Sequence, residues 1–434
     1  MQTKAYKCPC CGSSLAYDGA SSKLKCAACD NTFDVEALDA MDAAGEQGGI
    51  DFDLPRESFG ADDAAQMKGY RCKSCGAELI TEETTTATEC PYCGSPAVLP
   101  DRVEGGVKPE KVIPFTVGKE QAQQQFHDYF KGKRLLPNVF LKGGNSITEM
   151  RKLYVPYWLF DCQAHANIVY DAEKRHVERQ GDWEVTRTEH FIVRRSGSMA
   201  FENIPVDGSA KLDDKISESL EPYDLSAAVP FQPGVLAGAM ADHADVDSEA
   251  CERRASERVE NSMADSLRNT VSGFTTVSER SRQFHSDGGH VTPVLMPVWL
   301  ITTQKADKTY TFAINGQTGR LTCDVPADKG KSFAWGGGVF AAVLAIAALI
   351  MALADCLASG TLPLAAFAAL VVALIVVGVL RGQLKQAHSK SAAADYVRPD
   401  SFKLDVRYER FLYQSVQRRK IEKSDETKGT ASAQ

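Results

Sequence analysis

The chain has 434 residues, of which 44% are hydrophobic and 24% charged, and its formal net charge is −8 at pH 7. This length leaves room for two or three domains with a sizeable core. The charges are unevenly distributed: residues 333–380 contain one charged side chain, Asp355, whereas residues 381–434 contain 12 basic and 7 acidic side chains. The pattern excludes a simple soluble globule, a wholly disordered chain and a strongly basic nucleic-acid-binding protein.

Eight of the thirteen cysteines form two copies of one pattern near the N-terminus. In each copy, two Cys-x2-Cys pairs are separated by 14 residues, and the copies are offset by 64 residues. This spacing predicts two tetrahedral zinc sites with four thiolate ligands each, a closed arrangement that is structural rather than catalytic. The predicted ligands are Cys8, Cys11, Cys26 and Cys29 at the first site, and Cys72, Cys75, Cys90 and Cys93 at the second.

The residues around the cysteines agree with a metal site. A residue that tolerates positive φ follows the second cysteine of each pair, as the tight turn of a zinc knuckle requires: Gly12, Asp30, Gly76 and Gly94. Iron remains an alternative to zinc, because both metals accept tetrahedral sulfur. Residues 1–17 have no apolar core of a signal peptide, so we expect the thiols in the reducing cytosol and not in disulfides. Cys10 is interpreted as a spare thiol.

The ribbons are predicted at residues 1–38 and 68–103. Between them, residues 39–67 contain eight acidic side chains and only Arg56 as a base. This composition predicts a flexible, self-repelling linker that lets the two ribbons move independently.

Residues 104–328 are predicted to form a cytosolic α+β domain. Apolar residues recur at helical spacing near residues 118–131, and a thin apolar stripe predicts a second, polar helix at 247–267. That stripe consists of Val246, Ala250, Val259 and Met263. Stretches that mix aromatic and β-branched residues predict strands at Leu153–Tyr170, Trp183–Arg195, Val291–Thr303 and Thr309–Ile314, and a turn at Asn315–Gly319.

Part of this domain resembles an internal repeat. Residues 155–159 (VPYWL) resemble residues 296–300 (MPVWL). The strings predict two related units, each with a helix preceding a bent antiparallel sheet, unless their similarity is a coincidence.

The sequence contains no recognisable set of catalytic residues, so we expect no enzyme. Gly330-Lys331-Ser332 matches the end of a phosphate loop, but Val325 stands where the loop needs glycine, which argues against a helicase or another nucleotide-driven motor. Cys162 and His165 form a Cys-x2-His string in a predicted strand, where a spacing of three puts them on opposite faces, so we expect no shared site. Three further histidines are expected in polar loops: His243, His285 and His290.

Residues 333–380 predict a transmembrane helical hairpin. Phe333–Ala354 and Thr361–Leu380 are uncharged and long enough to cross a bilayer, although two buried core helices would show the same composition. The short loop between them has no Lys or Arg. Basic residues flank the outer ends instead, namely Lys329, Lys331, Arg381, Lys385 and Lys390. The positive-inside rule therefore predicts a two-pass protein of the cytoplasmic membrane with both termini and both ribbons in the cytosol.

Residues 381–434 form a basic-aromatic cytosolic tail. In Lys403–Lys423, seven basic and three acidic residues alternate with apolar and aromatic ones. Such a segment either lies against anionic membrane lipid or packs on the soluble domain, and the sequence leaves both possibilities open.

The charge of the ribbons argues against nucleic acid as a partner. Residues 1–38 have four basic and four acidic side chains, and residues 68–102 have four and five. Four thiolates and one Zn²⁺ add a net charge of −2 to each ribbon. The ribbons therefore lack the Lys and Arg footprint that phosphate binding needs.

The ordered combination of motifs resembles a bacterial group of membrane-anchored double-zinc-ribbon proteins. These carry labels such as "TFIIB-type zinc ribbon-containing" or "primosomal replication factor Y/helicase-like". The resemblance rests on residues 8–12 (CPCCG), 90–94 (CPYCG), 154–160 (YVPYWLF) and 310–319 (YTFAINGQTG), together with the apolar hairpin. It implies a membrane protein, in some members associated with phage-shock-type membrane-stress scaffolds and stomatin-like proteins.

Together these observations predict a non-enzymatic, membrane-anchored zinc-ribbon adaptor. Its expected partners are membrane lipid and cytosolic or membrane scaffold proteins. The alternative is a membrane-tethered nucleic-acid-binding protein, associated with replication or transcription, that uses the ribbons.

Overall fold

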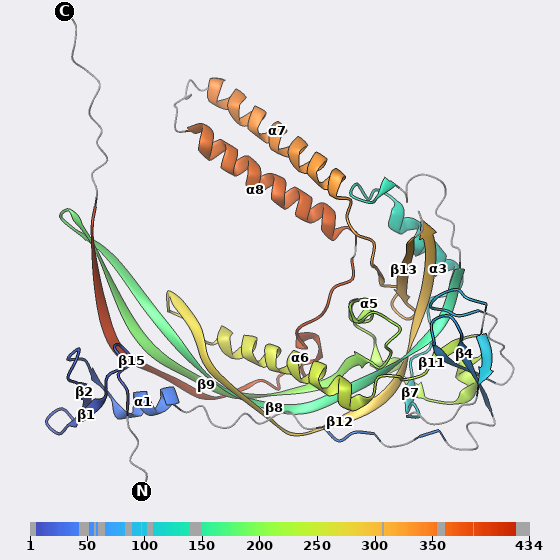
Figure 1. Ribbon diagram of the computed structural model, residues 1–434, viewed down its shortest axis with the longest axis horizontal. Helices are drawn as coiled ribbons and strands as arrows, with labels where there is room; N and C mark the ends of the chain where they lie inside the picture. The colour runs from blue at the N-terminus through green and yellow to red at the C-terminus, as the bar shows by residue number, and fades with distance from the viewer. Residues whose placement is uncertain are drawn as a thin grey trace, which may run out of the picture.

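A long, curved sheet forms the body of the protein (Figure 1). The computed structural model describes residues 6–42, 52–55, 58–59, 66–82, 89–96, 98–101, 107–138, 149–305, 308–353, 361–384 and 386–421. Four strands carry the sheet: β8 (Glu149–Gln180), β9 (Trp183–Asp207), β12 (Thr276–Lys305) and β15 (Lys403–Lys420). They lie in the order β12-β8-β9-β15, and each pair of neighbours is antiparallel.

These strands are longer than the sequence predicts. The strand predicted at 153–170 lies inside β8, which continues to Gln180 although its last residues are polar. An antiparallel partner satisfies the backbone whatever the side chains are, and β9 pairs with β8 up to this end. The prediction that His285 and His290 lie in loops is wrong for the same reason, because both lie within β12.

Helix α6 (Ser248–Asn269) covers one face of this sheet (Figure 1). Its N-cap is Asp247, whose side chain accepts a hydrogen bond from the amide of Ala250 at 2.8 Å. The helix confirms the prediction, but Ala250 is exposed and does not belong to the apolar stripe. The buried stripe has a spacing of four residues: Cys251, Ala255, Val259, Met263 and Leu267. It packs on β8 and β9 residues such as Ile168 and Val193 in the largest apolar cluster.

The order of elements repeats once along the chain. The first unit contains β7 (Lys111–Val112), α3 (Lys119–Phe130), β8 and β9. The second contains β11 (Met240–Asp242), α6, β12 and β13 (Lys308–Asn315). The short strands occupy matched places, since β7 runs parallel to β12 and β11 runs parallel to β8.

Equivalent residues of the two units make equivalent contacts. Val155 and Met296, which begin the two similar strings, lie directly opposite each other in the β8–β12 ladder. The indole N–H of Trp158 donates to the carbonyl of Val246 at 2.9 Å, just before α6. The indole N–H of Trp299 donates to the carbonyl of Val117, also at 2.9 Å, just before α3. These matched contacts support the predicted internal repeat, with each unit's tryptophan holding the other unit's helix.

The two cysteine-rich segments lie at different places on the sheet (Figure 1). The first contains β1 (Leu15–Asp18), β2 (Lys23–Cys26), β3 (Thr32–Phe33) and α1 (Val35–Asp42). The second contains β4 (Met67–Cys72), β5 (Glu78–Glu82) and β6 (Val98–Asp101). Its strand β5 pairs with β11, so the second segment is part of the large sheet. The prediction that the two ribbons move independently is therefore wrong for the second ribbon.

The predicted acidic linker at 39–67 is also corrected where the chain is described. Residues 39–42 belong to α1, and Met67 begins β4. Phe52 is buried, and its ring packs edge-on against Phe160 with centroids 4.9 Å apart. This aromatic contact fixes the middle of the segment to the sheet despite the acidic composition around it. Most of the remaining linker lies outside the described residues.

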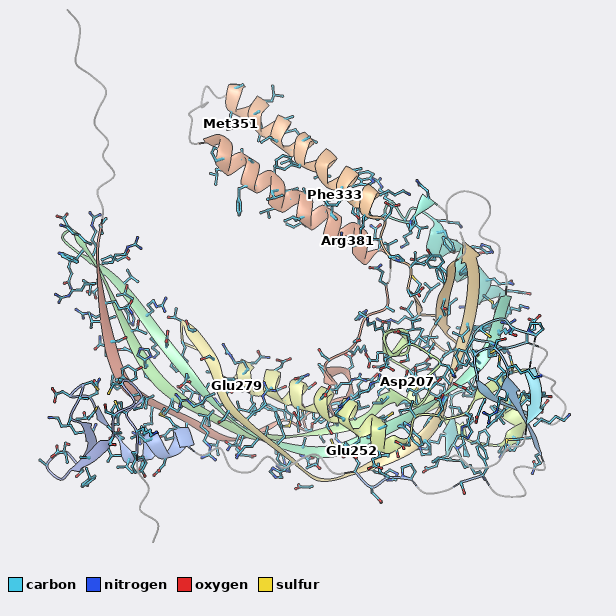
Figure 2. All side chains as sticks on the ribbon, in the orientation of Figure 1. Asp207, Glu252, Glu279, Phe333, Met351 and Arg381 are labelled. Atoms are coloured by element: carbon cyan, nitrogen blue, oxygen red, sulfur yellow. The ribbon has the colours of Figure 1, made fainter. Side chains whose placement is uncertain are left out.

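Two apolar helices form a hairpin that projects from the body (Figures 1 and 2). They are α7 (Lys329–Leu353) and α8 (Thr361–Gly382), and they pack on each other. The hydroxyl of Tyr129 on α3 donates to the carbonyl of Leu384 at 2.7 Å, just after α8. The loop predicted between the two spans lies outside the described residues.

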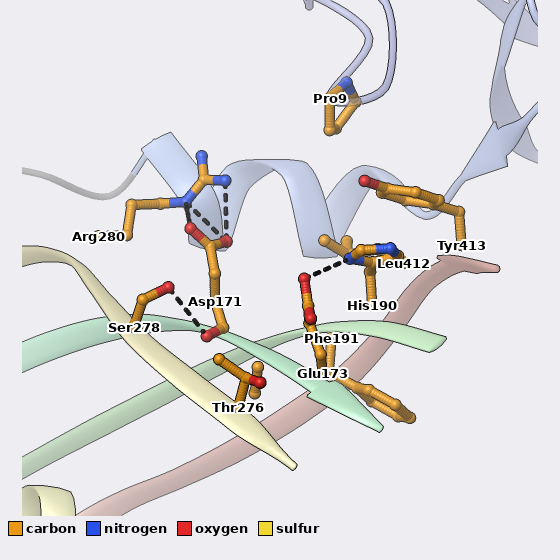
Figure 3. Close-up of a pocket in the computed structure, with 11 residues that line it drawn as sticks. Pro9, Asp171, Glu173, His190, Phe191, Thr276, Ser278, Arg280, Leu412 and Tyr413 are labelled. Carbon is orange, nitrogen blue, oxygen red and sulfur yellow. Dashed lines mark hydrogen bonds and ion pairs between the residues drawn. The ribbon is translucent and has the colours of Figure 1, made fainter. Parts of the chain in front are cut away.

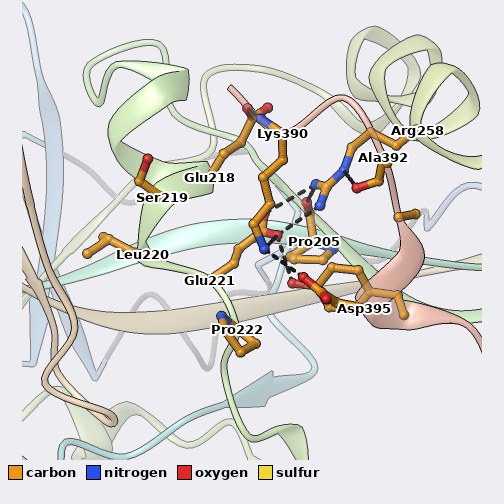
Figure 4. A network of polar contacts seen from close by, with 12 residues as sticks. Pro205, Glu218, Ser219, Leu220, Glu221, Pro222, Arg258, Lys390, Ala392 and Asp395 are labelled. Carbon is orange, nitrogen blue, oxygen red and sulfur yellow. Dashed lines mark hydrogen bonds and ion pairs between the residues drawn. The ribbon is translucent and has the colours of Figure 1, made fainter. Parts of the chain in front are cut away.

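The chain returns from the hairpin to the sheet through a buried ionic network (Figure 4). Arg258 on α6 makes two hydrogen bonds, at 3.2 and 2.8 Å, to the carboxylate of Glu221, which is fully buried. Tyr396 donates to the same carboxylate at 2.7 Å, and the ammonium of Lys390 lies 3.3 Å from it. The segment after α8 is thereby held against α6 before β15 begins.

Of the two possibilities for the tail, the structure has the segment packed on the sheet. All of β15 pairs with β9, from Lys403 opposite Ser198 to Lys420 opposite Trp183. Residues 422–434 lie outside the described residues. The other short elements are α5 (Asp214–Leu220), β10 (Val229–Pro230), β14 (Leu321–Cys323) and the 3-10 turns Leu225–Ala227, Pro233–Leu236 and Ala394–Tyr396.

Candidate metal centres and the surfaces around them

The first four predicted ligands meet at one point. The Sγ atoms of Cys8 and Cys29 lie 3.6 Å apart, and those of Cys11 and Cys26 lie 3.5 Å apart. All four Sγ atoms lie within 4.8 Å of one another. A tetrahedral zinc ion with Zn–S bonds of about 2.3 Å places its sulfur ligands about 3.8 Å apart. The cluster therefore fits a zinc ion and could hold one.

The second four predicted ligands form the same arrangement. The Sγ atoms of Cys72 and Cys93 lie 3.7 Å apart, and those of Cys75 and Cys90 lie 3.6 Å apart. These four atoms also lie within 4.8 Å of one another. Both clusters consist of thiolates only, so a bound ion would have no open position for water, as in structural metal sites.

Local backbone turns bring each pair of cysteines together. In every Cys-x2-Cys pair, the amide of the residue after the second cysteine donates to the carbonyl of the first, at 2.8 to 3.0 Å. These residues are Gly12, Asp30, Gly76 and Gly94, and all have φ between 57° and 74°. The turn needs this left-handed conformation, which glycine adopts without strain and Asp tolerates.

Cys10 does not belong to the first cluster of four. It is exposed, and its Sγ accepts from the side-chain amide of Asn31 at 3.5 Å. The same amide reaches the Sγ of Cys29 at 3.4 Å. The prediction of Cys10 as a spare thiol agrees with this position.

The ribbon that carries the first cluster packs on strands β8, β9 and β15 of the sheet. Leu24, Phe33 and Leu38 of the ribbon pack with Val169, Ile192 and Leu412 in one apolar cluster. These last three residues come from β8, β9 and β15. Sequence reasoning missed them, because their apolar character alone does not show which segment covers them.

A cavity lies between this ribbon and the sheet (Figure 3). It has a volume of about 320 Å³ and is lined by Pro9 and by side chains of all four long strands. Its charged groups are paired with each other: Arg280 donates to Asp171 at 2.9 and 3.0 Å, and His190 lies 3.5 Å from Glu173. The pairing leaves these groups little free charge with which to bind an ionic ligand.

The second cluster is attached through a buried carboxylate. Tyr92, which stands between Cys90 and Cys93, donates from its hydroxyl to Asp242 at 2.5 Å. Ser209 donates to the same oxygen at 2.5 Å. Burial raises the pKa of Asp242 to about 7, because desolvation of the carboxylate outweighs the hydrogen bonds from Ser209 and Tyr92 that stabilise its charge. Lys211 adds a hydrogen bond from its ammonium to the carbonyl of Cys75 at 2.9 Å.

The hairpin presents a large apolar surface. The spans Lys329–Ala352 and Pro363–Gly382 have mean hydropathies of 2.2 and 2.8, and their apolar side chains are almost entirely exposed. At 1.5 Å per residue these helices are about 36 and 30 Å long, which matches a hydrocarbon core of about 30 Å. Both helices are therefore long and apolar enough to cross a membrane. Their exposure argues against the alternative of two buried core helices.

Comparison with known proteins identifies the family of the chain. No family model and no solved structure matches the chain. The uncharacterized protein YdjG of Bacillus subtilis (strain 168) is 35% identical over 338 residues, which cover 77% of this chain and 94% of that protein. Identity at this level over nearly the whole relative requires a shared fold and descent, so the chain belongs to the family of B. subtilis YdjG.

Proposed function

We propose that the protein is a non-enzymatic, membrane-anchored zinc-ribbon adaptor that recruits cytosolic proteins to the inner surface of the cytoplasmic membrane. The observation that carries this proposal is the combination of an exposed apolar hairpin with two closed four-thiolate clusters on one continuous sheet. The hairpin supplies an anchor, and the ribbons supply small surfaces whose folding depends on metal.

The connectivity of the sheet supports a two-pass topology. Strand β15 follows the hairpin, and β9 precedes it, yet the two pair along the whole of β15. Segments that share a ladder lie in the same compartment, so a hairpin that enters the bilayer between them must cross it an even number of times. The basic residues at the outer ends, among them Lys329, Lys331 and Arg381, favour the cytosol for that compartment.

The chemistry of the clusters supports a binding role over a catalytic one. A zinc ion with four thiolate ligands has no position for substrate or water. The ribbons also carry no excess of basic side chains, which favours protein partners over nucleic acid. Scaffold proteins of the membrane are the partner class that the family resemblance suggests.

The test is crosslinking of the tagged full-length protein in its native membrane, followed by identification of proteins and nucleic acid in the eluate. We expect membrane-associated scaffold proteins, recovered whether or not the sample is treated with nuclease. A Cys11→Ser variant should lose partners that bind the first ribbon, whereas the matched Cys10→Ser variant, which changes a thiol outside the cluster, should retain them. Recovery of DNA or RNA, with partners lost after nuclease treatment, would reject the adaptor in favour of a nucleic-acid-binding protein.

A further inference from the structure

Three potential metal ligands lie on the face of the sheet opposite α6, and none of them belongs to either cysteine cluster. His165 lies on β8, and His285 and Asp287 lie on β12. His165 and His285 are opposite each other in the ladder. Asp287 is two residues beyond His285, and alternate residues of a strand share a face. The neighbours Ala164 and Ala166 pack in the apolar cluster beneath α6, so His165 faces the opposite side.

The three side chains converge closely. The two imidazole rings are stacked, with centroids 4.8 Å apart and planes 12° from parallel. His165 Nε2 lies 2.7 Å from Asp287 Oδ2. One potential ligand atom from each residue lies within 4.8 Å of those of the other two. Ligand atoms of a tetrahedral zinc ion with bonds of about 2.0–2.1 Å lie about 3.3 Å apart. Each imidazole binds metal through a lone pair in the ring plane, so metal binding requires the two rings to rotate out of their stacked arrangement.

A β-bulge interrupts the strand register beside Asp287. The β8–β12 ladder shifts between Ser286 and Gly289, and Gly288 has a φ of 98°. Bulges of this kind redirect side chains and occur frequently beside functional sites. Here the bulge lets Asp287 approach His165 on the neighbouring strand, which a regular ladder would not place directly opposite it.

We propose that His165, His285 and Asp287 form a third metal site, which binds a divalent transition ion such as Zn²⁺ exchangeably. Two imidazoles and one carboxylate are ligands that suit zinc, cobalt, nickel and copper. Each imidazole binds the ion as the neutral ring, through the lone pair of one ring nitrogen, and keeps its single N–H on the other nitrogen. Because the His165 and Asp287 side chains are 28% and 63% exposed, water reaches the ion and completes its coordination. The site therefore differs from the closed ribbons, and it is independent of the adaptor role.

The test uses full-length protein in detergent micelles that keeps zinc in its ribbons after exchangeable metal has been removed. The protein is titrated with Co²⁺ alone and followed by visible absorption. Nitrogen and oxygen ligands give cobalt weak d–d bands, whereas thiolate ligands add intense charge-transfer bands. We expect one further equivalent of cobalt without charge-transfer bands, since the ribbons keep their zinc. Changes in outer-shell partners of metal sites cost about 10–100-fold in affinity, so loss of a ligand in Asp287→Asn or His285→Ala should cost at least as much.

His290→Ala is the matched control, because it removes a histidine of the same strand outside the cluster and should leave the cobalt affinity unchanged. Absence of cobalt binding in the wild-type protein, or unchanged binding in Asp287→Asn, would overturn the proposal. Appearance of thiolate charge-transfer bands would show cobalt in the ribbons instead and would also count against a third site. Asp287→Asn keeps the size of the side chain, and retained zinc in its ribbons shows that the variant is folded.

Discussion

The two buried tryptophans offer a direct test of the internal repeat. Trp158 and Trp299 are each 2% exposed, and each indole donates to a carbonyl that precedes a helix. A Trp→Phe substitution at either position keeps an aromatic ring in the core but leaves that carbonyl without its donor. If the two units are equivalent, each substitution should destabilise the start of the helix that belongs to the other unit.

The expected magnitude follows from the lost hydrogen bond. A buried polar group left without its partner costs about 1–3 kcal/mol. If local opening governs hydrogen exchange, this loss accelerates exchange by about 5- to 150-fold. Trp158→Phe should therefore accelerate exchange of the amides in the first turn of α6, including Cys251, whose amide donates to Asp247. Trp299→Phe should do the same for α3, including Ala122, whose amide donates to Gly118.

The measurement is hydrogen exchange of the full-length protein, resolved by peptide. Trp183→Phe is the control, because that ring is 45% exposed at the tip of the sheet and should change exchange at neither helix. If only one of the two buried tryptophans protects its helix, the units are not equivalent and the matched contacts are coincidental. If exchange rises equally over the whole chain, the substitutions act on global stability and the local argument fails.

Three further predictions concern buried charge and metal. Glu221→Gln should lower the free energy of unfolding by about 3–5 kcal/mol, because it leaves the buried guanidinium of Arg258 without its carboxylate. Glu202→Gln, in the exposed pair with Arg398, should cost less than about 1 kcal/mol; the two variants are compared by their resistance to proteolysis. After exchangeable metal is removed, metal analysis should find about two zinc ions per chain in the wild type and in Cys10→Ser, and about one in Cys11→Ser. The pKa of Asp242 is about 7 in the folded state, above its value in the unfolded chain, so the folded state binds one more proton between these two pH values. The free energy of unfolding should therefore fall as pH rises from about 4 to 7, by up to about 4 kcal/mol. Thermal unfolding across that range should show a flatter pH dependence in Asp242→Asn.

The elements predicted correctly are those whose signal is local. A Cys-x2-Cys pair contains its own turn, so spacing and the following glycine were sufficient to predict which thiols meet. The hairpin is equally local, since uninterrupted apolar length decides whether a helix can span a bilayer. Helix α6 was found from its thin stripe, although the sequence placed Ala250 in the stripe where Cys251 stands.

The features that the sequence did not predict depend on pairing between distant segments. Nothing in residues 276–290 indicates a strand, and the segment becomes one because it pairs with β8. The candidate third metal site could not be predicted from the sequence for the same reason. Comparison of His165 with Cys162 correctly separates those two residues, but the relevant partner, His285, lies 120 residues away on the neighbouring strand. Register at that distance is set by the whole sheet, not by any short motif.

The segment after the hairpin shows how the two units act together. Near α8, the carbonyl of Leu384 is bound by Tyr129 of α3, which belongs to the first unit. Farther along, the amide of Ala393 donates at 2.7 Å to the hydroxyl of Ser262 on α6, which belongs to the second. The segment thus crosses from one repeated helix to the other before β15 joins the sheet. These contacts tie the segment that follows the hairpin to both units. In the proposed adaptor, this double attachment limits movement of the sheet and its ribbons relative to the anchor.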